Sequence, residues 1–317
     1  MSLLLSVVFV FFTLVARAYA QNKTSLPTAW YKGLSSDSSG SYLTAITIGG
    51  PLYYSTDSGV SWKVSDAPNP ADYNAVAASS TGQYVIATTT NATLVSSDYG
   101  QHFKKAADIY SLPHSVAVSG TGQYMISLDD LALPNSCVSY SNNYGVSFTL
   151  GLGPNSDVNY CTGVAIDTSG TYVVLSVFGS GLWVSGNVTD ASSWKLTYET
   201  EARIDSIAFG GANFYAGYWS SPASVVQSTD YGYTWTVKGS VPNRIYSMAV
   251  DSTGVNVLIA SELYLYLTQD SGSTYESLYS AFGIFNCAMN GDTTLAVFTA
   301  TPATDQSEFD VYIGNPL

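Results

Sequence analysis

Short runs of apolar and β-branched residues recur along the chain, and polar turns that contain glycine separate them. Residues 75–78, 84–87 and 93–95 are typical runs. Runs of this length with turn signals at both ends are typical of β-strands, and no 11-residue window has the 3.6-residue apolar period of an amphipathic helix. Many runs are apolar at successive positions, so both faces of the sheets are expected to be covered. The pattern predicts an all-β protein.

A hairpin motif, Ser-x-Asp-x-Gly-x-x-aromatic, is repeated along the chain. The full copies contain Asp57, Gly59 and Trp62, then Asp98, Gly100 and Phe103, then Asp230, Gly232 and Trp235. Drifted copies lie at 141–148 and 185–194, and another contains Asp270, Gly272 and Tyr275. The pattern predicts a tight turn in which the aspartate accepts hydrogen bonds from backbone amides, the glycine takes a positive φ, and the aromatic ring packs between sheets.

A second motif, a glycine-containing turn just before a strand, recurs seven times. Its glycines are Gly40, Gly82, Gly122, Gly170, Gly211, Gly254 and Gly291, with spacings of 42, 40, 48, 41, 43 and 37 residues. This period is typical of a four-stranded propeller blade. One blade cannot bury its own faces, so the sequence predicts a single seven-bladed β-propeller at 21–317 rather than two domains.

The Ser-x-Asp-x-Gly-x-x-Trp hairpin resembles the Asp-box, or BNR, repeat of sialidases, sortilin-type receptors, xyloglucan-type glycosidases and photosystem II assembly propellers. The resemblance extends over nearly all of 21–317 and implies the fold. In these families the hairpin is structural and remote from the ligand site, so the resemblance does not imply one function. Sialidases resemble one another in clamping the substrate carboxylate with three arginines. This chain has Arg17, Arg203 and Arg244, the first of them in the leader, so sialidase activity is not expected.

Residues 3–15 form an apolar run that is followed by Ala18-Tyr19-Ala20. This arrangement is typical of a secretory signal peptide cut after Ala20, and a retained anchor is the alternative. The sequence thus predicts a signal peptide at 1–20 and a secreted, extracellular protein without a membrane span after cleavage. Sequons at Asn22, Asn91 and Asn187 predict sites for N-glycans.

Composition excludes several classes of function. The 10 Lys and Arg residues face 23 Asp and Glu residues, so the net charge of −13 argues against a binder of nucleic acid or anionic membranes. Apolar residues make up 46% of the chain, which argues against disorder. The only histidines are His102 and His114. A site with several histidine ligands is therefore impossible, and we expect no metal and no cofactor.

Three cysteines allow one disulfide bond. Propeller topology places Cys137, before the C strand of the third blade, and Cys161, at the start of the A strand of the fourth, on one face between adjacent blades. We therefore expect a Cys137–Cys161 disulfide. Cys287 lies within an apolar strand and is expected to be a small buried side chain rather than a nucleophile.

A candidate ligand site follows from the repeat. Counting eight residues back from each turn glycine predicts the residues at the channel mouth, where the A strands begin: Lys32, Asn74, His114, Thr162, Arg203, Tyr246 and Gly283, with Arg244 just before the ring. The cations in this set favour an anionic or hydroxyl-rich ligand. The alternative is that Glu199, Glu201 and Asp205 neutralise them locally.

Many of the 25 tyrosines occupy repeat positions and are expected to be structural. Tyr42, Tyr84, Tyr124 and Tyr172 share one strand position, and Tyr99, Tyr144 and Tyr231 share one hairpin position. Aromatic residues outside the pattern are expected in loops on the face opposite the hairpins, where they form a candidate binding surface. They are Tyr73, Tyr110, Tyr160, Tyr198, Tyr218 and Trp219.

These observations favour a non-catalytic binding or structural module that recognises a glycan or an extracellular protein. One alternative is a glycoside hydrolase that uses loop carboxylates, with Asp129, Asp130, Asp157, Glu199 and Glu201 as candidates. The other is a self-assembling extracellular subunit. The residues after Tyr275 predict three strands of the seventh blade and no fourth, so that residues 21–28 supply the fourth strand, within the chain or in a neighbouring chain, or the strand is absent. We favour closure within the chain, because the tether is short.

Overall fold

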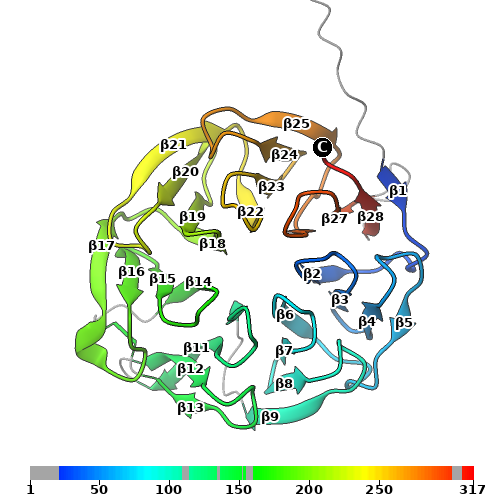
Figure 1. Ribbon diagram of the computed structural model, residues 1–317, viewed down its shortest axis with the longest axis horizontal. Helices are drawn as coiled ribbons and strands as arrows, with labels where there is room; N and C mark the ends of the chain where they lie inside the picture. The colour runs from blue at the N-terminus through cyan, green and yellow to red at the C-terminus, as the bar shows by residue number, and fades with distance from the viewer. Residues whose placement is uncertain (1–20, 109–113, 134–135, 152, 155–159, 302–308) are drawn as a thin grey trace, which may run out of the picture.

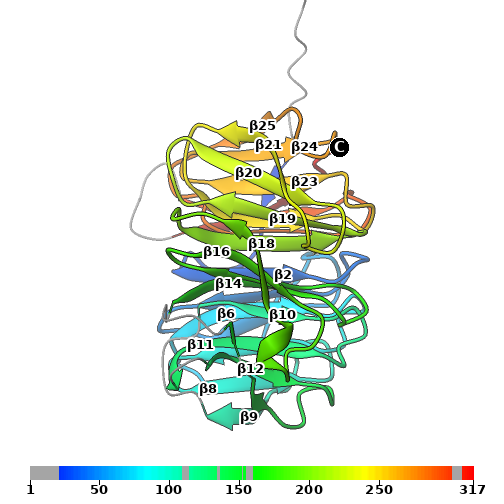
Figure 2. The ribbon, with the colours of Figure 1, turned by 90° about the vertical axis from the view of Figure 1, so that its left-hand side faces the viewer.

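The computed structural model describes residues 21–108, 114–133, 136–151, 153–154, 160–301 and 309–317. The predicted signal peptide at 1–20 lies outside this part. Seven four-stranded antiparallel sheets are arranged radially around a central axis (Figure 1), and the edge-on view in Figure 2 shows a flattened disc. The described residues contain one short 3-10 helix, η1 (Ala191–Ser193), and otherwise only strands and turns. The prediction of an all-β, seven-bladed β-propeller is confirmed.

Each blade has the same order of strands, from the innermost A strand to the outermost D strand. The A strands are β2 (Tyr31–Ser36), β6 (Tyr73–Ala78), β10 (Val116–Val118), β14 (Cys161–Ile166), β18 (Ile204–Gly210), β22 (Ile245–Val250) and β26 (Cys287–Met289). The B strands are β3 (Leu43–Thr47), β7 (Val85–Thr89), β11 (Met125–Leu133), β15 (Val173–Val177), β19 (Asn213–Tyr218), β23 (Val257–Ser261) and β27 (Ala296–Ala300).

The C and D strands follow outwards. The C strands are β4 (Leu52–Ser55), β8 (Ala92–Ser96), β12 (Ser136–Ser141), β16 (Gly181–Ser185), β20 (Ala223–Ser228), β24 (Tyr264–Thr268) and β28 (Asp310–Gly314). The D strands are β5 (Lys63–Val64), β9 (Lys104–Asp108), β13 (Thr149–Leu150), β17 (Lys195–Glu199), β21 (Thr236–Val241), β25 (Glu276–Ser280) and, for the seventh blade, β1 (Gln21–Lys23).

The burial of the strands explains the apolar runs of the sequence. Every residue of β3, β7, β15, β23 and β27 is buried, because each B strand is covered on both faces by neighbouring blades. The D strands β5 and β13 are exposed at the perimeter. Hydrophobic clusters cross the blade boundaries, so the core is a ring of contacts between blades rather than one central cluster.

The seventh blade is completed by the N-terminal segment of the same chain. Strand β1 pairs with β28 in antiparallel register, with Lys23 opposite Tyr312, and Figure 1 shows the two side by side. The pairing continues as Thr24 N donates to Val311 O at 2.9 Å, and Lys23 Nζ lies 2.8 Å from Asp310 Oδ1. Leu26 is buried in the cluster between the seventh and first blades. Closure is therefore intramolecular, as favoured from the sequence.

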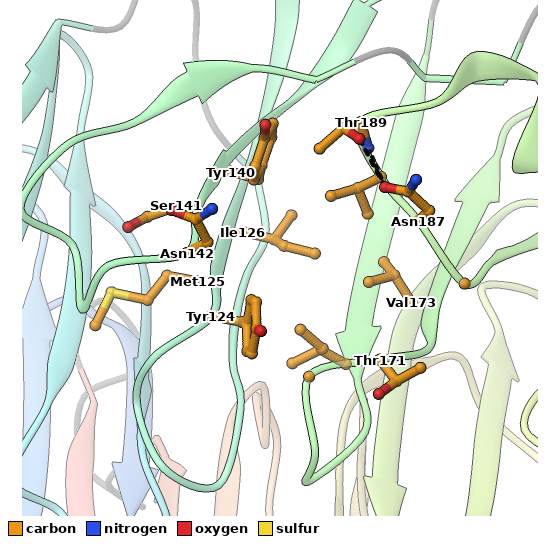
Figure 3. Close-up of a pocket in the computed structure, with 14 residues that line it drawn as sticks. Tyr124, Met125, Ile126, Tyr140, Ser141, Asn142, Thr171, Val173, Asn187 and Thr189 are labelled. Atoms are coloured by element: carbon orange, nitrogen blue, oxygen red, sulfur yellow. Dashed lines mark hydrogen bonds between the residues drawn. The ribbon is translucent and has the colours of Figure 1, made fainter.

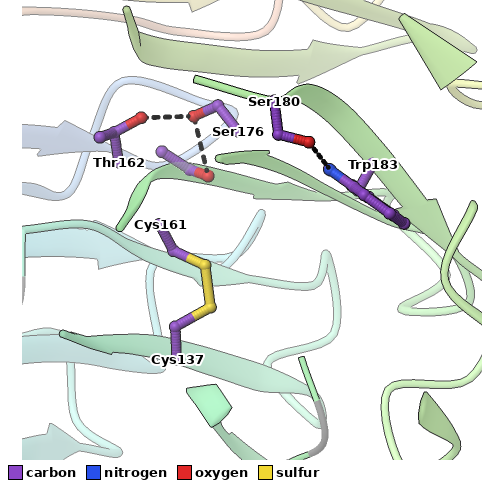
Figure 4. The surroundings of a disulfide bond; sticks show 7 residues. Cys137, Cys161, Thr162, Ser176, Ser180 and Trp183 are labelled. Atoms are coloured by element: carbon purple, nitrogen blue, oxygen red, sulfur yellow. Dashed lines mark hydrogen bonds between the residues drawn. A yellow bond between two sulfur atoms is a disulfide. The ribbon is translucent and has the colours of Figure 1, made fainter. Parts of the chain in front are cut away.

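The predicted disulfide joins the third and fourth blades. Cys137 in β12 and Cys161 in β14 are bonded, with their Cα atoms 6.1 Å apart (Figure 4). Both lie in the hydrophobic cluster that these two blades share. Cys287 is buried in β26 and has no disulfide partner, and burial raises the pKa of its thiol to about 12. The thiol is therefore protonated at neutral pH, as expected of a packing residue.

Candidate functional site

The repeated hairpins, which join strands C and D, are built by side-chain hydrogen bonds to the backbone. Asp57 Oδ1 accepts from Ser61 N at 2.8 Å, Ser55 Oγ accepts from Gly59 N at 2.9 Å, and Gly59 has a φ of 78°. The same network recurs around Asp98, Asp230 and Asp270. The indoles of Trp62 and Trp235 also donate to backbone carbonyls. The predicted capping role of the aspartates is confirmed.

Replacement of Asp230 by alanine is expected to lower the free energy of unfolding by about 1–2 kcal/mol, because the amide and hydroxyl of Thr234 and the hydroxyl of Ser228 lose their acceptor. Chemical denaturation measures this loss. Asp230→Asn is the matched control, since Asn143 accepts from Ser147 N at the equivalent position and keeps the turn. Loss of ligand binding at unchanged stability would contradict the structural role.

The hairpin aspartates also predict an acid-sensitive fold. Hydrogen bonds from the backbone amide and then the hydroxyl of Thr274 lower the pKa of Asp270 to about 2. A carboxylate whose pKa is lower in the folded state stabilises the fold above its unfolded pKa of about 4 and loses that contribution as the pH falls through the folded value. Stability is expected to fall between about pH 4 and pH 2, and less steeply in Asp270→Asn. The melting temperature is measured as a function of pH for both proteins. Identical curves for the unaltered protein and Asp270→Asn would refute the contribution of Asp270.

A ring of seven residues surrounds the axis where the A strands begin. In five blades the register between strands A and B shifts by one residue and leaves one A-strand residue unpaired at this level. The unpaired residues are Lys32, Asn74, Thr162, Asp205 and Tyr246, and His114 and Phe285 hold the equivalent positions in the third and seventh blades.

Two members of this ring differ from the sequence prediction. The turn between β18 and β19 is shorter than its counterparts, so Asp205 replaces Arg203. In the seventh blade Thr293, with a φ of 62°, takes the turn position assigned to Gly291. Phe285 therefore replaces Gly283, which is not among the residues that line the cavity. The counting rule failed where the turn had changed length or lost its glycine.

The ring lines a cavity of about 400 Å³ at one mouth of the channel. Of the residues predicted for this site, Lys32, Asn74, His114, Thr162, Arg203 and Tyr246 line the cavity. Counting missed the other lining residues, which are Trp30, Tyr31, Ile48, Asp205, Phe285, Asn286 and Phe309. Trp30 and Phe309 pack edge to face at 5.2 Å between the first and seventh blades, so the closure of the ring also shapes this mouth.

Outside this ring lies a rim that carries both arginines. Trp30, Tyr160, Arg203 and Arg244 share one repeat position, because each main-chain carbonyl accepts a hydrogen bond from the residue after strand B of its blade. The rings of Trp30 and Tyr160 are 50% and 59% exposed. The cavity-lining residues do not include Arg244, but its guanidinium carbon lies 4.6 Å from the Trp219 ring centroid, and that of Arg203 lies 4.7 Å from it. The two arginines therefore contact the same indole.

The polar groups of the mouth are only partly paired. Arg203 Nε lies 2.7 Å from Asp205 Oδ1, so local neutralisation occurs at this arginine. The other two candidate counter-ions, Glu199 and Glu201, are exposed. Asn74 Nδ2 is buried and has no hydrogen-bond partner among the described residues, which leaves a donor for an acceptor oxygen of a ligand or of water.

Several other candidates are structural or fall outside the described part. Tyr73 is fully buried and donates to Pro68 O at 2.7 Å, and Tyr218 donates to the hydroxyl of Tyr198 at 2.9 Å, so these three do not form the expected loop surface. Tyr110, Asp157 and the side chains of Asp129 and Asp130 lie outside the described residues. The asparagines of the three sequons, Asn22, Asn91 and Asn187, are exposed.

Within the described residues, no helix is long and apolar enough to cross a membrane. The same residues contain no group of three His, Cys, Asp or Glu side chains arranged to hold a metal ion.

Comparisons with known proteins identify the fold but not the activity. No family model and no curated protein sequence matches the chain. Among solved structures, the WD40 repeats of RRP9 superpose with a TM-score of 0.72 at 14% identity, covering 94% of this chain and 99% of that one. YCF48 bound to a D1 peptide superposes at 0.63 and 13% identity, covering 94% and 96%. The GH74 xyloglucanase from Xanthomonas campestris superposes at 0.70 and 13% identity, covering 92% of this chain and 55% of that one. At these identities the similarity shows the propeller fold alone.

Proposed function

We propose that the protein is a secreted, non-catalytic binding module that recognises acidic glycans at the rimmed mouth of its channel. One observation carries this proposal: the two arginines that follow residue 20 both lie over the ring of Trp219, beside a cavity that is also lined by Lys32 and His114. The rest of the chain is strongly acidic, so this mouth favours an anion. Secretion is supported by the disulfide bond.

The aromatic residues favour a sugar over a simple anion. Trp30 and Tyr160 present exposed rings at the rim, and such rings stack on the apolar faces of pyranoses. Asn74 Nδ2 offers an unpaired donor inside the cavity, where a sugar hydroxyl would accept its hydrogen bond. A uronic acid or sulfated sugar thus meets a guanidinium, an aromatic face and an amide in one site.

The glycoside hydrolase alternative has less support. Among the described residues that line the cavity, Asp205 is the one carboxylate, and it is paired with Arg203. Hydrolysis by the usual two-carboxylate mechanism needs a second acid on the other side of the bond. We also propose that the repeated hairpins are Asp-box repeats, which is supported by their shared hydrogen-bond network.

A glycan array tests the function. We expect binding to uronic acid or sulfated glycans and weaker binding to their neutral counterparts. Arg203→Ala and Lys32→Ala are each expected to reduce the signal. Equal binding of acidic and neutral glycans, or release of reducing sugar from a bound glycan, would contradict the proposal. Capture of a protein partner without glycan binding would instead support the extracellular protein alternative.

A further inference from the structure

Tyrosine pairs bridge three of the interfaces between neighbouring blades. In each pair, one ring precedes a B strand and the other belongs to the repeated hairpin of the following blade. The ring centroids are 4.1 Å apart for Tyr42 and Tyr99, 4.9 Å for Tyr84 and Tyr144, and 4.7 Å for Tyr172 and Tyr231. These distances are typical of aromatic pairs that stabilise an interface.

Tyr124 holds the same position before β11, but the hairpin of the following blade has no tyrosine to meet it. The carbonyl of Tyr124 accepts from Ser119 N, as the equivalent tyrosines accept in their blades. In the fourth-blade hairpin Asn187 N donates to Ser185 Oγ, as the aspartate amide does in the other hairpins. Asn187 therefore holds the repeat position of the hairpin aspartate. Val188, the next residue, holds the position that a tyrosine occupies in the hairpins of the three pairs.

The ring of Tyr124 packs against Gly170 and borders a cavity. A Cβ added at Gly170 would collide with the Tyr124 ring, so this glycine covers the ring as Gly122 covers Tyr84. Beside the ring lies a cavity of about 320 Å³, which Gly170 also lines and into which Tyr124 and Tyr140 point across from Asn187 and the strand β15 (Figure 3). The hairpin that elsewhere supplies a tyrosine leaves this space open.

The chemistry of the lining is neutral and mixed. None of the described residues that line this cavity carries a charged side chain. Apolar side chains and the two tyrosine rings form the floor, whereas exposed amides and hydroxyls, including those of Asn142 and Thr189, form the rim. This combination suits an uncharged ring attached to a polar group, and it differs from the cationic channel mouth.

We propose that this cavity is a binding site for an aromatic side chain, tyrosine or phenylalanine, of a partner polypeptide. The three intact interfaces are the template, because in each a tyrosine carried by a polypeptide turn packs against the ring equivalent to Tyr124, stacked in two of the pairs and tilted in the third. A partner ring restores the missing half of the fourth pair. The amide and hydroxyl groups of the rim hydrogen-bond to the partner backbone on either side of the ring.

The test uses N-acetyl-tyrosinamide, N-acetyl-leucinamide and a five-residue Gly/Ser peptide with a central tyrosine. Amide NMR signals of Gly170 and Gly186 report on the cavity. We expect the tyrosine probe to shift them with an affinity of about 1 mM, the leucine probe to bind at least about tenfold more weakly, and the peptide to bind more tightly than the free amide. Equal responses to tyrosine and leucine probes, or no response to any probe, would overturn the proposal.

Three variants separate occupancy of the cavity from general effects. Val188→Tyr supplies the missing ring from the chain itself, so probe affinity should fall at least tenfold while the melting temperature is maintained or rises. Ser58→Tyr adds a tyrosine at the same hairpin position of the first blade and should leave binding unchanged; in the preceding blade Leu295 holds the repeat position of the tyrosine before strand B. Tyr124→Leu removes the stacking face and should also weaken binding. Probe binding that is unchanged in both Val188→Tyr and Tyr124→Leu would refute the site. Nuclear Overhauser contacts between a sugar on Asn187 and Tyr124 would also refute it, because they would show that the chain's own glycan occupies the cavity.

Discussion

Deletion of residues 21–28 is expected to lower the free energy of unfolding by about 5 kcal/mol or more. The deletion removes the whole D strand of the seventh blade, the hydrogen bond from Thr24 N to Val311 O, and the buried side chain of Leu26. It also exposes the outer edge of β28 at the perimeter of the propeller. A large fall in the melting temperature is the expected result, and aggregation is expected to follow from the open strand edge.

The control for this deletion keeps the backbone pairing and changes only the outward side chains. The double variant Asn22→Ala and Lys23→Ala retains β1 but loses the sequon and the ion pair with Asp310. It should lose less stability, because Lys23 is half exposed and the buried carboxylate of Asp310 keeps its hydrogen bond from Thr28 Oγ1. Sedimentation distinguishes the alternative of donation to a neighbouring chain. If the deletion leaves the melting temperature unchanged and abolishes oligomers, closure within the chain is wrong.

Loss of the Cys137–Cys161 bond is the second large effect. In the chain-entropy model, a bridge that closes a loop of this size stabilises the fold by about 3 kcal/mol. The bond also joins the third and fourth blades inside their shared hydrophobic cluster. The double variant Cys137→Ala and Cys161→Ala should therefore unfold at a lower denaturant concentration than the unaltered protein.

Reduction provides the matched comparison for the disulfide. A thiol reductant should destabilise the unaltered protein and leave the double variant unaffected. Cys287→Ala keeps the bridge and should retain the response to reductant, since Cys287 is a buried thiol in another blade. A reductant effect of equal size in the double variant would show that the stabilisation does not come from this bond.

The fold could be predicted from the sequence because the turns that separate its strands are specified by residues close together in the chain. A turn such as that of Gly40, with a φ of 74°, needs a residue that tolerates the left-handed region, and hairpin aspartates such as Asp57 need fixed neighbours. The turn glycine and the hairpin aspartate each recur in most of the blades, at the same position of the repeat. The disulfide followed in turn, because blade order determines which strands are neighbours.

The candidate site was only partly predictable because it depends on register between strands. Asp205 and Phe285 occupy ring positions that the count from Gly211 and Gly291 missed, since one turn is shorter and the other uses Thr293 in place of glycine. The pairing of Arg203 and Arg244 around Trp219 joins two blades, and no sequence spacing encodes that contact. The empty position opposite Tyr124 became visible only when the other tyrosine pairs were seen in contact.

The most direct test of the account is the affinity of the protein for its best-binding acidic glycan, measured by titration calorimetry in two double variants. Arg203→Gln with Arg244→Gln removes the cations around Trp219. Lys63→Gln with Lys104→Gln removes the same charge from the exposed D strands β5 and β9. We expect the first variant to lose at least about tenfold in affinity at unchanged melting temperature and the second to bind like the unaltered protein. Equal affinity of all three proteins, or an equal loss in both variants, would contradict binding at the channel mouth.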